Sequence, residues 1–265
     1  MKKTIAGLLL FAAFVASPAH AIDVDEIISS YYENTGGEDA WDKLSGVKLT
    51  GEFAQGSQKF PFELVQLKGG KQYLKFTFQG KDIKQGVFDG TTMWNTNFMT
   101  MKAEKADAEA TANQKLESND FPSDLFHYKQ KGYTAELLGN ESIDGTDTYK
   151  IKLVKEPLTV DGKKVANITY YYFDTEALVP LVTESEIKSG PAKGKMGQNK
   201  LSDYQEVNGL YFPFSMTQGI KDGPSATMLV KKIELNPKVD DSAFSMPPPA
   251  PEAKPEPKPA TKKAG

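Results

Sequence analysis

The residues that could support acid–base or metal chemistry are few in this 265-residue chain. His20 and His127 are the two histidines, and His20 falls within the first 21 residues. A single remaining imidazole supports neither a histidine-rich metal site nor a Ser-His-Asp arrangement with a histidine to spare. His127 stands between Phe126 and Tyr128 on an expected helix, where we predict a structural or surface role. The patterns GxSxG, HExxH, GxGxxG and GxxxxGK are absent.

Carboxylates offer a second kind of chemistry. Glu184 and Glu186 are two residues apart on an expected strand, so their side chains share one face, and paired carboxylates flank the bond in glycosidases. Nothing in the surrounding sequence marks a cleft, and we expect a solvated face. Asp144, Asp147 and Asp161 lie near glycines but lack the alternating ligands and final glutamate of a calcium loop, which favours hairpin turns. We therefore predict no enzyme activity, no catalytic residue, no metal site and no cofactor.

Apolar residues are much more prominent than reactive ones. Three of the eight methionines fall in the nine residues Met93–Met101, and methionine with aromatic residues makes adaptable surfaces for apolar ligands. Packing in a core requires the same residue types, so either role is open for each. The predicted residues of an apolar ligand-binding surface are Phe53, Phe62, Leu74, Phe76, Phe78, Met93, Trp94, Phe98, Met99, Met101, Phe121 and Leu125.

The elements that must position these residues change character along the chain. Apolar residues at helical spacing from Val24 to Tyr32, with Asp23 as a cap and Gly36-Gly37 as a stop, predict an amphipathic helix. A second short helical turn is expected from Glu38 to Leu44. From Val47 onward apolar and polar residues alternate, which predicts antiparallel strands with one apolar face.

Glycine-containing dipeptides separate these strands. The pairs that predict hairpin turns are Gly69-Gly70, Asp89-Gly90, Asp144-Gly145, Asp161-Gly162, Asn208-Gly209 and Asp222-Gly223. They imply roughly eleven or twelve strands in all. A helical interruption is expected over residues 103–131, polar and alanine-rich at first and more apolar over residues 121–128.

Both ends of the chain predict something other than a folded domain. Lys2 and Lys3, an apolar run and Ala19-His20-Ala21 predict a signal peptide over residues 1–21. The apolar run is shorter than the roughly twenty residues of a membrane-spanning helix. No cysteine is present for a disulfide or a lipid anchor. One domain is expected over residues 22–246 and a disordered Pro/Lys/Glu-rich tail over residues 247–265.

The charge pattern argues against nucleic acid as a partner. Residues 1–21 hold two of the 32 basic residues, so 30 face 35 acidic residues in the rest of the chain, a balance of −5. Every basic residue is lysine. The absence of arginine removes the usual bidentate clamp for phosphate and carboxylate groups. We therefore expect a soluble, non-lipidated protein, exported by the general route to the periplasm.

Several segments together resemble the LolA-like family of periplasmic outer-membrane lipoprotein-sorting proteins. They are DGTTMWN (89–95), DGTDTYKIKL (144–153), TYYYFDTEALVPLV (169–182), DYQEVNGLYFPFSM (203–216) and IELNPKVDDSAFSMP (233–247). The order of these segments carries the resemblance more than any one of them does. It extends over residues 24–247.

The resemblance implies a mainly β fold: a curved antiparallel half-barrel of about eleven strands, with residues 103–131 as part of a helical lid. It also implies a periplasmic carrier or chaperone that binds the acyl chains of a lipoprotein or lipid for transfer towards the outer membrane. A membrane-bound donor or acceptor would be met by transient surface contact only. The alternative is a LolA-like sensor or regulatory module of the cell envelope that binds lipid or a protein partner. The arginine that latches the lid in well-known carriers of this family has no counterpart here, and lysine lacks its planar fork.

Overall fold

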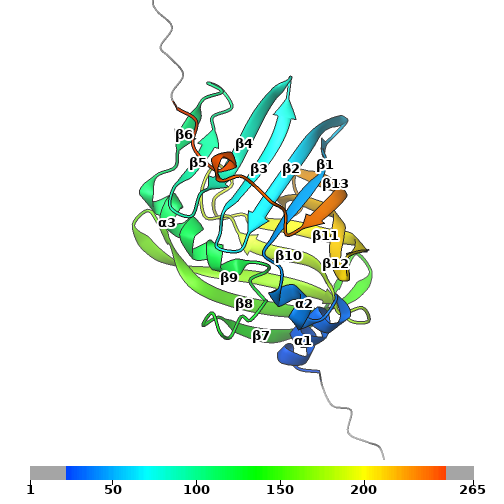
Figure 1. Ribbon diagram of the computed structural model, residues 1–265. Coiled ribbons are helices and arrows are strands. Elements are labelled where there is room, and N and C mark those ends of the chain that lie inside the picture. Colours follow the sequence, from blue (N-terminus) through cyan, green and yellow to red (C-terminus); the bar gives the residue numbers. More distant parts are fainter. Residues whose placement is uncertain (1–21, 249–265) are drawn as a thin grey trace, which may run out of the picture.

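The computed structural model describes residues 22–248, which form one antiparallel sheet of thirteen strands and a few short helices (Figure 1). The strands are β1 (Gly46–Gln55), β2 (Gln58–Leu67), β3 (Gln72–Phe78), β4 (Lys81–Phe88), β5 (Met93–Thr96), β6 (Ala103–Lys105), β7 (Thr134–Ile143), β8 (Thr146–Val160), β9 (Lys163–Asp174), β10 (Pro180–Glu186), β11 (Met196–Val207), β12 (Leu210–Ile220) and β13 (Ser225–Leu235). The helices are α1 (Val24–Asn34), α2 (Glu38–Asp42), α3 (Ala108–Glu117), and the 3-10 turns η1 (Ser118–Asp120) and η2 (Asp241–Ala243).

The sheet is open, with β1 and β13 paired at its centre. The strand order is β6-β5-β4-β3-β2-β1-β13-β12-β11-β10-β9-β8-β7, so β6 and β7 are the two edges. We call β1–β6 the first wing and β7–β13 the second wing. The predicted fold class is confirmed, with thirteen strands in place of about eleven. The strand β6 falls where a helix was expected, because three residues are too few for alternation to be read.

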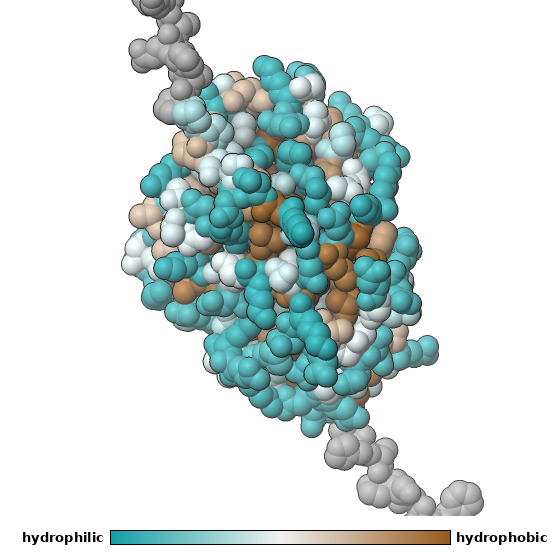
Figure 2. All heavy atoms as spheres, in the orientation of Figure 1, coloured by the Kyte–Doolittle hydropathy of each residue, from teal (hydrophilic) through white to brown (hydrophobic). Residues whose placement is uncertain are grey.

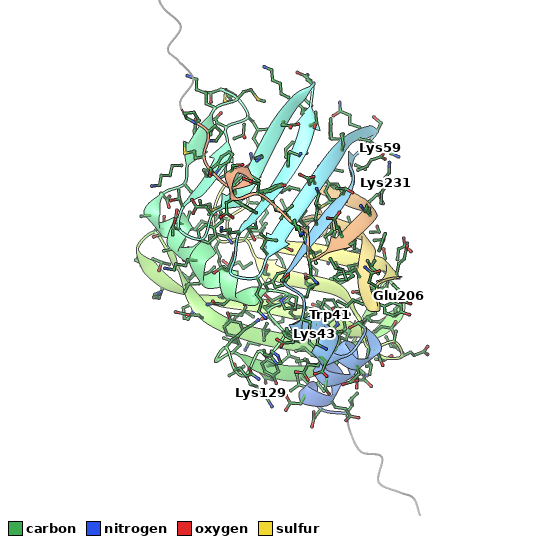
Figure 3. The ribbon with its side chains drawn as sticks, viewed as in Figure 1. Trp41, Lys43, Lys59, Lys129, Glu206 and Lys231 are labelled. Atoms are coloured by element: carbon green, nitrogen blue, oxygen red, sulfur yellow. The ribbon has the colours of Figure 1, made fainter. Side chains whose placement is uncertain are left out.

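The predicted turns and first helices are confirmed. Each of the glycine-containing dipeptides lies between two consecutive strands. Asp144-Gly145 and Asn208-Gly209 have positive φ at both residues, as the turns that match strand twist require. At the N-terminal side, the Asp23 carboxylate accepts a hydrogen bond of 2.9 Å from the Glu26 amide and caps α1. Trp41 of α2 is buried against the sheet, where Figure 3 labels it.

The prediction of a helix over residues 121–128 is wrong. The helical part ends with η1 at Asp120, and hydrogen-bonded turns follow up to β7. Phe121 is extended (φ −82°, ψ 137°) because it precedes Pro122, and a residue before proline is disfavoured in helical geometry. His127 has a left-handed backbone (φ 52°) within these turns rather than a place on a helix. This irregular stretch is nevertheless strongly apolar.

Two apolar clusters lie on opposite faces of the sheet. The larger one joins residues of both wings with Ile27 of α1, Trp41 of α2 and Leu125; we call its side the inner face. The smaller one contains Val65, Tyr73, Val87, Trp94 and Phe244, and lies on the outer face of the first wing, where η2 packs. Figure 2 shows that apolar atoms also reach the surface in patches near the middle of one view of the molecule.

The predicted signal peptide and most of the predicted tail lie outside the described residues. Within residues 22–248, no helix combines the length and the apolar character that crossing a bilayer requires.

Candidate ligand-binding site

An irregular segment fills part of the inner face. Residues 118–133, which we call the plug, contribute Leu125, Phe126, Tyr128 and Tyr133 to the buried inner cluster, with Phe121 packed against it. Leu125 is 1% exposed. The ring of Phe126 lies 5.1 Å from that of Tyr32 on α1, in edge-to-face geometry. The plug therefore covers the sheet with side chains that belong to no helix or strand.

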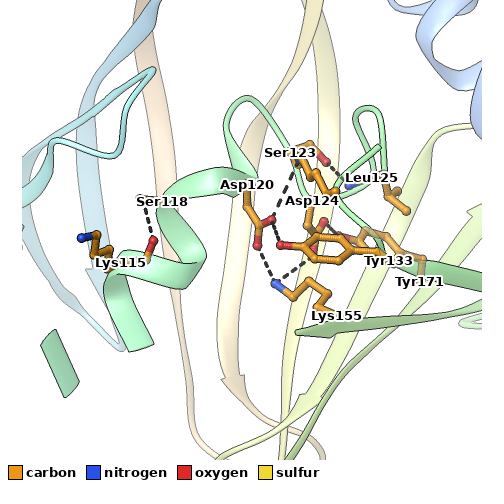
Figure 4. A network of polar contacts seen from close by, with 10 residues as sticks. Lys115, Ser118, Asp120, Ser123, Asp124, Leu125, Tyr133, Lys155 and Tyr171 are labelled. Carbon is orange, nitrogen blue, oxygen red and sulfur yellow. Dashed lines mark hydrogen bonds and ion pairs between the residues drawn. The ribbon is translucent and has the colours of Figure 1, made fainter. Parts of the chain in front are cut away.

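One polar cluster ties the plug to the second wing (Figure 4). The Lys155 ammonium of β8 lies 2.8 Å from an Asp120 carboxylate oxygen and 3.2 Å from one of Asp124. All three side chains are at most 15% exposed. Tyr133 donates a 2.9 Å hydrogen bond to Asp120, and Tyr171 of β9 donates one to Asp124. A buried lysine thus bridges two plug carboxylates, which are themselves held by tyrosine hydroxyls.

The electrostatics of this cluster favour the charged lysine. Burial disfavours the charged form of Lys155, but attraction to Asp124 and Asp120 outweighs it and raises the pKa of Lys155 above its ordinary value. The cluster is therefore a charge-assisted tie at neutral pH, and removal of either partner would leave a buried charge.

A second set of contacts ties the plug to the helices α1 and α2. Tyr128 and Lys129 both donate hydrogen bonds to the Asp25 carboxylate of α1. Hydrogen bonds from Lys129 and then Tyr128 lower the pKa of Asp25. His127 Nδ1 lies 3.1 Å from a carboxylate oxygen of Glu38. Apart from Tyr128, the side chains in these contacts are more exposed to solvent than those of the Lys155 cluster.

Six of the predicted ligand-binding residues meet in one cluster. They are Phe53, Phe62, Leu74, Phe76, Phe121 and Leu125, all on or against the inner face. The rings of Phe53 and Phe76 are stacked with their centres 6.3 Å apart. These residues are now packed against each other or against the plug, so their availability to a ligand remains a prediction.

The other predicted residues are dispersed. Trp94 lies on the outer face, where its indole donates a 2.9 Å hydrogen bond to the Phe244 carbonyl. Met101 lines an outer hollow beside Trp94. Phe78, Phe98 and Met99 are exposed large hydrophobic residues, and Met99 is 95% exposed. Of these three, Phe98 still reaches the inner-face residues, because its ring centre lies 5.9 Å from that of Phe76. Since Trp94 and Phe76 lie on opposite faces of the sheet, they do not line one cavity.

A cavity of about 680 Å³ lies between α3 and the second wing. Met93 of β5 lines it from the first wing, and Ala110, Asn113, Gln114 and Glu117 line it from one face of α3.

Contacts to backbone groups fix α3 across the cavity. The side-chain Nδ2 of Asn113 donates a 2.7 Å hydrogen bond to the backbone carbonyl of Thr159. Its Oδ1 accepts a 2.9 Å hydrogen bond from the backbone N–H of Thr159. The Glu109 carboxylate accepts from the amides of Asp161 and Gly162, both at 2.9 Å. The helix is thus held by polar contacts although it has no buried residue.

Sequence reasoning missed the polar wall of this cavity. Lys155, Asn167, Thr169 and Ser185 line it from β8, β9 and β10. In the sequence, short hydroxyl and amide side chains on a strand are typical of any solvated face. Which of them lie side by side depends on the register of neighbouring strands, which the sequence alone does not reveal. The tie through Lys155 was missed for the same reason, because Asp120 and Lys155 are 35 positions apart.

The prediction of a solvated face for Glu184 is wrong. The side chain is 4% exposed on the outer face. Its carboxylate accepts hydrogen bonds from Lys221, from Gln198 at 2.8 Å and from Tyr172 at 3.0 Å. Burial acts to raise the pKa of Glu184. The hydrogen bonds from Lys221, Gln198 and Tyr172 have the larger effect, so the pKa is lowered overall. Glu186 pairs with Lys188 instead, so the two carboxylates do not act as a pair.

Asp144 and Asp161 occupy hairpin turns as expected, whereas Asp147 lies in a strand, as the second residue of β8. Asp144 and Asp161 have positive φ and lie 2.7 Å from Lys200 and 2.6 Å from Lys193, respectively. Among residues 22–248, no group of three or more histidine or acidic side chains gathers in a way that could hold a metal ion.

Comparisons with known proteins bear on the family and the fold. A family model described as "Uncharacterized protein" matches residues 101–247, more than half of the chain. This chain belongs to that family. No curated protein matches the sequence.

Solved structures confirm the predicted LolA-like fold. A LolA superfamily protein from Nitrosomonas europaea aligns with a TM-score of 0.50 at 14% identity, covering 85% of this chain and 98% of that one. A domain from Vibrio parahaemolyticus, described as an outer membrane lipoprotein-sorting protein, aligns with a TM-score of 0.50 at 12% identity, covering 83% of this chain and 94% of that one. At these identities the likeness concerns the fold, an open antiparallel sheet with few helices.

Proposed function

We propose that this protein is a non-enzymatic periplasmic carrier that binds the acyl chains of a lipoprotein or lipid and transfers them towards the outer membrane. The observation that carries the proposal is the plug: an apolar segment, irregular after η1, that occupies the inner face and is held there by polar ties. A segment of this kind can be exchanged for another apolar chain without unfolding the sheet.

The exchange has a simple energetic basis. An acyl chain gains about 0.8 kcal/mol for each methylene removed from water. Displacement of Phe121, Leu125 and Phe126 would uncover inner-face residues such as Phe62 and Leu153, which belong to the same cluster. The incoming chain would replace those apolar contacts, and the uncovered Asp25 and Lys129, which are more than half exposed already, would return to water.

The predicted signal peptide and the name of the Vibrio domain support the cellular setting. That domain is described as lipoprotein-sorting, and its fold is shared here. A carrier between two membranes requires a donor and an acceptor, which this protein would meet transiently at the membrane surface.

The proposal is tested by locking the plug. Because the chain has no cysteine, the double variant D25C/K129C can be joined by a short thiol cross-linker at the Asp25–Lys129 ion pair. Cross-linking should slow uptake of the neutral fluorophore N-phenyl-1-naphthylamine by at least about tenfold, because plug movement is the gating step. The matched control is D144C/K200C, at an ion pair whose charged atoms are 2.7 Å apart and which joins the β7–β8 turn to β11. It should take up the probe normally when cross-linked.

A displacement assay tests whether acyl chains are the groups that the protein binds. An acylated lipopeptide should displace the fluorophore from the unmodified protein, and the same peptide without acyl chains should not. Equal displacement by both peptides, or no binding of the fluorophore, would contradict the carrier proposal. Unchanged uptake after D25C/K129C cross-linking would contradict the assignment of the plug as the gate.

A further inference from the structure

The polar wall of the cavity under α3 is a row of neighbouring side chains. Asn167 of β9 pairs in register with Lys155 of β8, and Thr169 pairs with Ser185 of β10. Residues 167 and 169 are two apart, so both point to the inner face. Within residues 22–248, no hydrogen bond engages the side chains of Asn167, Thr169 or Ser185. These uncharged donors and acceptors are therefore free to bind a ligand in the cavity.

Unlike the neutral side chains, the lysines around the cavity are already paired with carboxylates. The lining includes three lysines and five carboxylates: Lys155, Lys188, Lys193, Asp107, Glu109, Glu117, Asp161 and Glu186. Each of these lysines is already paired: Lys155 with the plug, Lys188 at 2.8 Å from Glu186, and Lys193 at 2.6 Å from Asp161. An anionic ligand would meet an excess of negative charge and no unpaired lysine in this lining.

Glu117 adds to this preference. It lines the cavity from α3 without being buried, and partial loss of water around its carboxylate is the main cause that raises its pKa, with Asp120 and Asp124 acting in the same direction against Lys155. A second anion placed beside it would be unfavourable.

Two apolar side chains of the lining, one from each wing, provide for an alkyl chain. Met93 is paired with Phe88 on the inner side of the first wing, and Leu158 lines the cavity from β8. A ligand with its polar end at Thr169 would direct an attached chain towards Met93.

We propose that the cavity under α3 is a headgroup site for a neutral, hydroxyl-bearing lipid, with Asn167, Thr169 and Ser185 as its hydrogen-bonding residues. This inference rests on the proposed carrier function and specifies its ligand class. Anionic phosphate headgroups are disfavoured by charge. Quaternary ammonium headgroups, although the carboxylates attract them, are disfavoured because they neither donate hydrogen bonds to the neutral row nor accept them from it.

The test compares ligands of one chain length. The full exported chain, loaded with N-phenyl-1-naphthylamine, is titrated below micelle concentrations with monolauroylglycerol, dodecyl phosphate and dodecyltrimethylammonium. Monolauroylglycerol should displace the fluorophore at concentrations about tenfold lower than either charged compound, a difference equivalent to one or two hydrogen bonds. Equal or tighter displacement by a charged compound would overturn the inference and leave the carrier proposal intact. Failure of the fluorophore to bind would instead contradict the carrier proposal itself.

Variants locate the headgroup. Thr169→Val and Ser185→Ala remove hydroxyls with little change in shape, and together they should reduce the monolauroylglycerol preference by about tenfold. Displacement by dodecyl phosphate should not change. Thr50→Val is the control, because Thr50 is also half-buried but lies on β1, away from the cavity. Loss of the preference in the control, or its retention in the double variant, would contradict the assignment.

Discussion

The two wings present unlike surfaces to the space that they enclose. On its inner side the first wing carries aromatic and aliphatic residues, among them Phe53, Phe62 and Phe76. The second wing is apolar near α1, but towards α3 its inner side carries Lys155, Asn167 and Thr169. A single sheet therefore presents an apolar region and a polar region to the same interior. This asymmetry suits an amphiphile lying in one orientation better than a purely apolar ligand.

The largest effect is expected from the tie between the second wing and the plug. Lys155→Met leaves the carboxylates of Asp120 and Asp124 buried without their cation, which should cost about 3–5 kcal/mol. Urea unfolding measures the loss. The triple variant K155M/D120N/D124N removes the charges together and should recover most of the stability. No recovery would mean that packing, rather than charge, makes Lys155 important.

The same tie predicts a dependence on alkaline pH. The folded pKa of Lys155 is raised above its ordinary value of 10.5, so its stabilising contribution is complete below pH 10.5 and is lost as pH rises through the folded pKa. The melting temperature of the wild type should therefore fall more steeply above that pH than the melting temperature of the triple variant. Parallel declines would contradict this assignment.

A comparable loss of stability is expected in the apolar wing. Phe62 is 4% exposed in the inner cluster, and Phe62→Ala should cost about 3–5 kcal/mol because it leaves a cavity. Unlike Lys155→Met, it should show no added pH dependence in urea unfolding. If Phe62→Ala cost less than 1 kcal/mol, roughly the effect of an ordinary substitution, the inner cluster would not be a packed core.

A smaller effect is expected on the outer face. The hydrogen bonds to Glu184 lower its pKa below the ordinary 4.5, so their stabilisation is present above pH 4.5 and is lost as pH falls through the folded pKa. Glu184→Gln should cost about 1–2 kcal/mol at pH 7. The difference from the wild type should shrink at pH 3 in thermal unfolding. If the stability difference between the wild type and Glu184→Gln grew on acidification, the pKa of Glu184 would not be lowered by folding.

The smallest effect is expected for Met99→Ser. Met99 is almost fully exposed, so the free energy of unfolding should change by less than about 0.5 kcal/mol. Fluorophore uptake should also be unchanged if ligand binding depends on the inner face. A clear loss of uptake would extend the binding surface to the turn between β5 and β6.

The sequence predicted the features that depend on local chemistry. Alternation and turn dipeptides such as Asp144-Gly145 and Asn208-Gly209 were sufficient for the antiparallel sheet, and the Asp23 cap for α1. Features that depend on distant partners were not accessible. Glu184 is buried because Lys221 and Gln198 reach it from other strands.

The candidate site divides in the same way. Phe62 and Leu125 could be predicted as apolar and central, since their residue type decides that. The separation of Trp94 from Phe76 follows from strand register and from η2, which packs Phe244 against Trp94. The neutral row at Asn167 and Thr169 emerges only when β8, β9 and β10 are aligned.

An unclosed sheet keeps two free borders, which in principle invite other chains to add strands. The border at β6 is three residues long and carries Glu104 and Lys105, too short and too charged to template a partner. The border at β7 is interrupted by the register shift before Gly139, and Glu136 and Glu141 project from it on either side of the shift. These irregularities disfavour edge-to-edge pairing between copies of the chain, so an open sheet need not imply a polymerising one.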